Sequence, residues 1–274
     1  MKIGSLCTGY GGLDMAVEAY FNAEMVWCAE NDKYASKVIE ARFNKPNLGN
    51  IKQINWASVE PIDILTAGYP CQPFSHAGHR KGSNDERHLW PFIKEVISIL
   101  RPSIVILENV KGHLTLGFKE VLAELTEIGY DAKWTIVRAS DVGAPHQRAR
   151  LFILAYPNSQ GLQRESNQGH SAAKCTSIDT SVELKPHNRQ MSELRKRFTP
   201  RSEMHLQAIP PTLDKGRVSA QFVEYMMGLP KGWVTDIDIS WTQQLKMLGN
   251  GVVPQQAYYA LELLFDLPSD LRFC

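Results

Sequence analysis

Apolar residues in the first 157 positions form short runs that alternate with longer stretches of helical periodicity. The short runs predict strands at Lys2–Cys7, Met25–Ala29, Ile62–Ala67, Ile104–Leu107, Ala132–Val137 and Leu151–Ala155. The periodic stretches predict helices at Leu13–Phe21, Lys33–Phe43, Leu89–Leu100 and Phe118–Ile128. Strands separated by helices are typical of right-handed crossover units, so we predict an α/β fold with a mostly parallel sheet.

This pattern ends at Pro157. Residues 158–217 are polar and weakly periodic, with ten Lys or Arg against six Asp or Glu. Either a solvated insert or a unit that contacts a polyanion fits this excess of positive charge. Helical periodicity returns at Phe222–Met227 and at Pro254–Phe265, where the second helix has proline in its first turn.

Composition narrows the class of protein. With 274 residues, 43% apolar and 22% charged, the chain fits a soluble globular protein, and its net charge of +1 does not indicate a partner. The five cysteines form no CxxC pair, which favours reduced thiols over disulfides or zinc. No signal peptide and no membrane-spanning run is recognisable, so we expect a cytoplasmic protein without a membrane partner.

Glycines follow the first predicted strand, in Ser5–Asp14. Such a turn lets the backbone approach a ligand, although many α/β proteins use one only for packing. Glu30, at the end of the next strand, is suited to accept hydrogen bonds from two ribose hydroxyls. The alternative for Glu30 is a surface carboxylate beside Lys33.

Cys71 lies between Pro70 and Pro73, just beyond a predicted buried strand. Free cysteines are usually inert core residues, but these rigid polar flanks do not suit a core. The polar, glycine-containing stretch that follows, His76–Asp85, suits a mobile lid. We therefore consider Cys71 a candidate nucleophile.

Charged residues stand beside two further strands. Glu108 and Asn109 follow the apolar run Ile104–Leu107, and an acid there should lie in a cleft because its burial is costly. Arg148 and Arg150, in His146–Arg150, would point to the same side of an extended segment and could hold a phosphate or an acid. Ordinary solvated charge is the alternative for both arginines.

In order and spacing these elements resemble the DNA cytosine-C5 methyltransferases. The matching segments are Cys7–Gly12, Pro70-Cys71-Gln72, Glu108-Asn109-Val110, His146–Arg150, Phe222–Pro230 and Leu248–Pro254. The resemblance runs from residue 3 to about 265, interrupted at roughly 158–216. It implies a Rossmann-like S-adenosylmethionine-dependent methyltransferase fold with a small target-recognition domain. We divide the chain into a catalytic domain at 1–157, a recognition domain at 158–235 and a returning segment at 236–274.

The resemblance also implies a reaction. Cys71 would attack carbon 6 of a flipped cytosine in duplex DNA, Glu108 would protonate ring nitrogen 3, Arg150 would hold the carbonyl oxygen, and Arg148 and Asn109 would support the site. Contacts to S-adenosylmethionine are expected from Leu6, Cys7, Gly9, Gly11, Gly12, Glu30, Asn31, Asn50, Ile51, Gly68, Pro70, Leu89, Asn250 and Val252. DNA contacts are expected from Gln72, Ser75, Arg87, Arg195 and Arg197. We expect no metal, a monomer, and a cognate restriction endonuclease as a candidate partner.

Some positions depart from the commonest family sequence. Cys7 and Asn31 stand where aromatic residues often pack on adenine, and Asn50 stands where an aspartate contacts the adenine amino group. His146 replaces glutamine, and Gly251 replaces serine or alanine. These departures bear on cofactor affinity more than on the reaction, because Cys71, Glu108 and Arg150 are kept.

Three rival functions stay open. A transfer-RNA methyltransferase of the same fold would typically have Phe-Thr after a Pro-Pro-Cys, whereas here Cys71 is followed by Gln72 and Pro73. A non-enzymatic DNA-binding relative should have lost the nucleophile or the acid. A small-molecule methyltransferase would leave Glu108 and the late motifs without a role.

Overall fold

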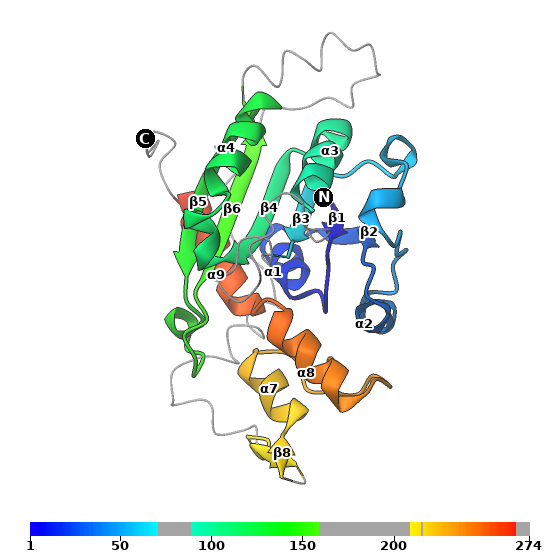
Figure 1. Ribbon diagram of the computed structural model, residues 1–274, viewed down its shortest axis with the longest axis vertical. Helices are drawn as coiled ribbons and strands as arrows, with labels where there is room; N and C mark the ends of the chain where they lie inside the picture. The colour runs from blue at the N-terminus through cyan, green and yellow to red at the C-terminus, as the bar shows by residue number, and fades with distance from the viewer. Residues whose placement is uncertain (71–88, 159–208, 215, 267–274) are drawn as a thin grey trace.

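A computed structural model describes residues 1–70, 89–158, 209–214 and 216–266 of the chain. Its centre is a six-stranded sheet in the order β2-β1-β3-β4-β6-β5 (Figure 1). The strands are β1 (Lys2–Leu6), β2 (Glu24–Ala29), β3 (Ile64–Gly68), β4 (Ile104–Val110), β5 (Tyr130–Val137) and β6 (Arg150–Pro157). The first four strands are parallel, and β6 is antiparallel to both of its neighbours. The predicted α/β fold with a mostly parallel sheet is confirmed.

The reversal of β6 follows from the short connection that precedes it. Between Val137 and Arg150 the chain forms only a short 3-10 helix, η5 (Ala139–Val142). This link contains no α-helix that could cross back over the sheet, and β6 returns as the antiparallel neighbour of β5. It thereby fills the position between β4 and β5.

Helices cover both faces of the sheet. On one face, α1 (Gly12–Phe21) and α9 (Pro254–Asp266) pack together and share an apolar cluster with the strands. On the other face, α3 (Trp90–Leu100) and α4 (Phe118–Glu127) bury a second cluster, and they lie toward the viewer in Figure 1. This arrangement is the Rossmann-like three-layer fold. No helix in these described parts of the chain is both long and apolar enough to cross a membrane.

A third apolar cluster lies beyond the sheet, where α7 (Ala220–Met226) packs on α8 (Trp241–Asn250) below the strands in Figure 1. Tyr10 from the turn after β1 and residues from α2 (Lys33–Phe43) belong to the same cluster. A two-stranded ribbon of β7 (Leu213–Asp214) and β8 (Arg217–Val218) precedes α7. The domain division stays a prediction, and its boundary at 235/236 falls between α7 and α8.

The structure corrects the sequence-based elements at two places. β4 extends to Val110, so Glu108 and Asn109 lie within the strand and not after it, because β6 pairs with β4 as far as Val110 and Arg150. The helix α8 was not predicted, because its sequence is largely polar and ends in Gly249-Asn250-Gly251, which suggests a turn. The remaining predicted helices and strands are confirmed, with ends shifted by one or two residues.

Candidate active site

A cavity of about 450 Å³ opens at the carboxyl ends of the parallel strands, where open α/β sheets bind ligands. The residues at its wall come from the ends of β1 to β4, from the first turn of α1, from the segments after β2 and α2, and from α8 with the turn that follows. The predicted cofactor residues among them are Leu6, Cys7, Gly9, Gly12, Glu30, Asn31, Asn50, Ile51, Gly68, Pro70, Leu89, Asn250 and Val252. Gly11 is absent from this wall. A Cβ atom at Gly11 would lie 2.4 Å from the Phe43 ring, so glycine is needed there for packing.

The turn after β1 is held in a conformation that requires glycine. Gly9 has a φ of 60° and Gly11 a φ of 82°, in the left-handed region that other residues rarely adopt. A Cβ atom at Gly12 would lie 2.1 Å from the carbonyl oxygen of Val252, whereas one at Gly9 would meet no atom within 4 Å. Gly12 therefore serves packing, and Gly9 leaves open space at the cavity wall.

The Glu30 side chain contacts the backbone of this glycine turn. Its carboxylate accepts hydrogen bonds from the backbone N–H groups of Gly9 and Asp32, each at 2.8 Å. Burial raises the pKa of Glu30, and the two amide hydrogen bonds act against that rise. A carboxylate held in this way does not fit the alternative of a surface residue beside Lys33.

Four of the departures from the family pattern lie at this wall: Cys7, Asn31, Asn50 and Gly251. The Asn50 side chain accepts a hydrogen bond from the N–H of Lys52 at 3.1 Å and caps the short helix η1 (Ile51–Gln53). Its amide oxygen keeps a second lone pair, so it can still accept from a ligand. Burial raises the pKa of the Cys7 thiol to about 12, so this cysteine stays neutral at the cavity wall.

The Gly251 departure has a steric cause. The Tyr10 ring is fully buried against this turn, and its hydroxyl donates a hydrogen bond to the Val252 carbonyl at 2.7 Å. A Cβ atom at Gly251 would lie 1.9 Å from that ring. The serine or alanine usual in the family therefore has no room here.

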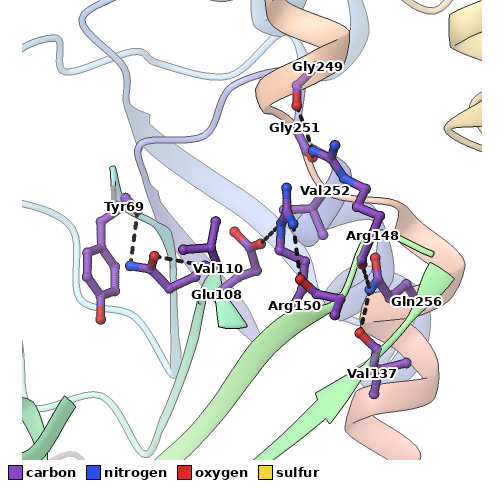
Figure 2. Close-up of polar contacts among 12 residues, drawn as sticks. Tyr69, Glu108, Val110, Val137, Arg148, Arg150, Gly249, Gly251, Val252 and Gln256 are labelled. Atoms are coloured by element: carbon purple, nitrogen blue, oxygen red, sulfur yellow. Dashed lines mark hydrogen bonds and ion pairs between the residues drawn. The ribbon is translucent and has the colours of Figure 1, made fainter. Parts of the chain in front are cut away.

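Glu108, which lines the cavity, forms an ion pair with Arg150 (Figure 2), and we call this part of the cavity its catalytic end because these two predicted catalytic residues lie there. The Arg150 Nε lies 3.0 Å from the Glu108 Oε1, and the Glu108 residue is 7% exposed. Burial raises the pKa of Glu108 to about 6, while the positive charges of Arg150 and Arg148 act in the opposite direction. The carboxyl group is therefore able to exchange a proton near neutral pH.

Arg148 is placed differently from the prediction. Its φ is 36°, so the segment is not extended there, and the two arginine side chains do not follow the alternation of a strand. The Arg148 Nη2 donates to the carbonyl oxygens of Gly249 at 2.7 Å and Gly251 at 2.6 Å. Gln256 donates in turn to the Arg148 carbonyl at 2.8 Å (Figure 2). Arg148 thus ties the start of β6 to the turn before α9.

Asn109 braces the chain just before the candidate nucleophile. Its side chain donates to the Tyr69 carbonyl at 3.3 Å and accepts from the N–H of Val110 at 2.8 Å. The Tyr69 hydroxyl also meets the Nε2 of buried His113 at 2.9 Å. Because the His113 Nδ1 faces the Leu116 carbonyl at 2.9 Å, Nδ1 carries the hydrogen and Tyr69 donates to Nε2.

Several predicted residues lie outside the described part of the chain. They are the candidate nucleophile Cys71, the lid His76–Asp85 and the DNA-binding candidates Gln72, Ser75, Arg87, Arg195 and Arg197. The structure also brings polar residues to the cavity that the sequence analysis missed: Asp14, Thr66, Gln243 and Lys246. The position of Asp14 in the turn after the glycines was a usable signal. Gln243 and Lys246 had none, because α8 was not predicted.

Comparisons with known proteins agree with this geometry. The family model of the C-5 cytosine-specific DNA methylases matches residues 1–214. The Type II methyltransferase M.NgoBI of Neisseria gonorrhoeae is 36% identical over 163 residues, which are 58% of this chain and 51% of that protein. M.HaeII of Haemophilus aegyptius is 32% identical over 201 residues, which are 72% of this chain and 63% of that protein. The matched part of the chain spans about half the length of most of these curated relatives.

Solved structures share the fold over nearly the whole chain. The Entamoeba histolytica methyltransferase EhMeth has a TM-score of 0.65 at 20% identity and covers 97% of this chain and 98% of its own. A DNMT2 variant of Spodoptera frugiperda has a TM-score of 0.61 at 17% identity. The match covers 97% of this chain and 99% of that protein. The sheet, the cavity at its carboxyl edge and the family match lead to one conclusion: this chain belongs to the C-5 cytosine-specific DNA methylase family.

Proposed function

We propose that the protein transfers a methyl group from S-adenosylmethionine to carbon 5 of a cytosine flipped out of duplex DNA. The observation that carries this proposal is the place of the Glu108–Arg150 pair. Glu108 lines the cavity and lies level with Gly68 in the β3–β4 ladder. Gly68 precedes Cys71 by three residues in the sequence. An acid able to hold a proton therefore stands beside the segment that leads to the candidate nucleophile.

The residues at the cavity wall fit the cofactor. Glu30 has a carboxylate fixed by backbone amides at the end of β2, where a ribose would present two hydroxyls. Asn50 and the apolar side chains of Leu6 and Ile51 line the same cavity and suit a purine. When bound, S-adenosylmethionine would supply an electrophilic methyl group on its sulfonium sulfur.

Cys71 and Glu108 would activate the base. The Cys71 thiolate forms a bond to carbon 6, and the electron pair of the 5,6 double bond makes carbon 5 nucleophilic. Negative charge that develops on the ring is relieved when protonated Glu108 donates to nitrogen 3. Carbon 5 takes the methyl group, and the electron pair of the broken S–C bond stays on the sulfur of the cofactor. Loss of the carbon 5 proton to a base then restores the 5,6 double bond and expels the Cys71 thiolate, while nitrogen 3 returns its proton to Glu108.

Arg150 would have two tasks in this scheme. Its guanidinium is held by Glu108 and offers further N–H groups to the carbonyl oxygen of the base. Its charge also prevents the pKa of Glu108 from rising further, so that the acid can give and regain a proton near neutral pH. Arg148 and Asn109 fix the two flanking segments and need not touch the base.

Trapping on a fluorinated base tests the proposal. The protein is incubated with labelled S-adenosylmethionine and duplexes of varied sequence that carry 5-fluorocytosine in place of cytosine. Fluorine cannot leave as the proton does, so we expect a denaturant-resistant protein–DNA adduct that contains the methyl label. Cys71→Ser should give no adduct.

Matched substrates separate the alternatives. Transfer RNA carrying 5-fluorocytosine is tested in parallel, and an adduct on that RNA alone would overturn the assignment of DNA as substrate. Methyl label on an exocyclic amine, or an adduct that survives in Cys71→Ser, would overturn the mechanism. Bisulfite sequencing of DNA from cells that express the chain would then identify the recognition sequence.

A further inference from the structure

A buried carboxylate at the cavity wall has no place in the scheme above. Asp14 lies in the first turn of α1 and is 1% exposed. Its Oδ1 accepts a hydrogen bond from the Thr66 hydroxyl on β3 at 2.5 Å, and the Ser5 hydroxyl is a second partner. The Ser5 hydroxyl lies 2.8 Å from that of Thr8. All four side chains line the cavity, so a polar network forms its floor behind the glycine turn.

The charge of Asp14 is not matched by a cation. Two of the other carboxylates at the cavity wall have cationic partners: Glu108 pairs with Arg150, and Asp32 lies 3.9 Å from Lys246. Glu30 is held by backbone N–H groups. In the described residues, the partners of Asp14 are hydroxyls and its own backbone amide. Burying an anion without a counter-charge costs free energy, and a positively charged ligand would lower that cost.

The position of Asp14 indicates which end of a ligand it would meet. Thr66 precedes Gly68 by two residues on β3, and Gly68 is level with Glu108 in the ladder. The partners of Asp14 lie on β1 and β3, so Asp14 lies between Glu30, at the end of β2, and Glu108, on β4. Glu30 and Asn50 mark the end suited to adenosine, so Asp14 lies next to it on the way to Glu108. The cationic groups of S-adenosylmethionine, its sulfonium and its ammonium, are both in the methionine part.

We propose that Asp14, held by Thr66 and Ser5, provides the negative charge that recognises the cationic methionine end of the cofactor. This inference rests on the proposed function. It assigns Asp14 a positioning and specificity role in binding, and the reaction steps stay with Cys71 and Glu108.

The effect of Asp14 on the stability of the free protein supports this inference. Burial raises the pKa of Asp14 to about 6, so ionised Asp14 costs the free protein stability above that pH. A carboxylate kept only for the fold would be expected to stabilise it. A charge that destabilises the free protein and faces a ligand cavity is instead typical of a functional group.

Binding measurements with three ligands test the inference. Dissociation constants are measured by calorimetry for S-adenosylmethionine, S-adenosylhomocysteine and the neutral 5′-methylthioadenosine, which lacks the amino acid part. Asp14→Asn should weaken S-adenosylmethionine roughly tenfold or more and change 5′-methylthioadenosine by less than about twofold. An equal loss for S-adenosylhomocysteine would assign the effect to the ammonium, and a smaller loss would assign it to the sulfonium.

Glu120→Gln is the matched control, because it removes a carboxylate from the first turn of another helix, α4, and Glu120 is not among the residues that line the cavity. We expect it to change each constant by less than about twofold. The melting temperature of Asp14→Asn at pH 8 should equal or exceed that of the unmodified protein, which shows that the fold persists.

Three outcomes are decisive. Equal losses for S-adenosylmethionine and 5′-methylthioadenosine, or no loss for either, would overturn the role of Asp14. If the unmodified protein binds 5′-methylthioadenosine but not S-adenosylmethionine, the proposed function fails as well.

Discussion

The two ends of the cavity hold their polar groups in different ways. At the end suited to adenosine, main-chain groups fix the side chains: Glu30 accepts from two backbone N–H groups, and Asn50 caps a short helix. At the catalytic end, Glu108 on β4 and Arg150 on β6 form an ion pair between their side chains. Main-chain contacts depend little on the identity of neighbouring side chains, whereas an ion pair requires both partners.

This difference agrees with the positions of three of the five departures from the family sequence. Cys7, Asn31 and Asn50 all lie at the adenosine side of the wall, where the backbone carries much of the geometry. Glu108 and Arg150 are kept, since a change in either leaves a buried charge without its partner. The comparison can be tested by changing one residue at each end and one outside the cavity.

The largest effect is expected at the catalytic end. Glu108→Gln keeps the size of the side chain but cannot give up a proton, so single-turnover methyl transfer to DNA should slow by about 10²- to 10⁴-fold. The dissociation constant of S-adenosylmethionine should stay within about threefold. A loss of less than tenfold in rate would show that Glu108 is not the acid.

A smaller effect on rate and a larger one on binding are expected at the adenosine end. Glu30→Ala removes the acceptor for the Gly9 and Asp32 amides, and we expect a roughly tenfold higher dissociation constant for S-adenosylmethionine. The rate at saturating cofactor should change by less than about threefold. Glu24→Ala removes an exposed carboxylate from the start of β2, the strand that Glu30 follows, and this control should bind S-adenosylmethionine normally.

A slow rate for Glu30→Ala at saturating cofactor would contradict the separation of the two ends. It would mean that the glycine turn also positions the reacting groups.

The smallest effect concerns a carboxylate outside the cavity. Burial raises the pKa of Glu18 to about 7, and its carboxylate accepts a hydrogen bond from the N–H of Met25 at 3.0 Å. Because the folded pKa lies above the ordinary value of 4.5, the stability from protonated Glu18 is complete at low pH and is lost as pH rises to about 7.

Glu18→Gln removes this dependence. Its free energy of unfolding should exceed that of the unmodified protein by about 1 to 2 kcal/mol at pH 8, after a discount for partial exposure, and by little at pH 4. Urea unfolding at the two pH values measures this difference, and methyl transfer should be unchanged. A variant that is less stable at pH 8 would show that the ionised Glu18 is stabilising.

Much of the fold could be predicted because it depends on local pattern. Helices such as Lys33–Phe43 and strands such as that at Met25 follow from the spacing of apolar residues, which decides which face is buried. Short motifs also located the cavity, because the ends of parallel strands meet at one edge of the sheet. The helix α8 escaped prediction although Trp241, Leu245 and Leu248 have helical spacing and belong to one apolar cluster, because polar residues dominate the segment and Gly249-Asn250-Gly251 suggests a turn.

The sequence by itself determined the order of the elements, the family motifs and the residue types available for catalysis, since these are properties of the chain. Tertiary structure alone decided which of these residues meet. Arg148 and Arg150 are two positions apart, yet one binds carbonyls near Gly251 and the other binds Glu108, because the backbone turns left-handed at Arg148. Asp14 and Thr66 are joined by the packing of α1 on β3, a contact that no local pattern encodes.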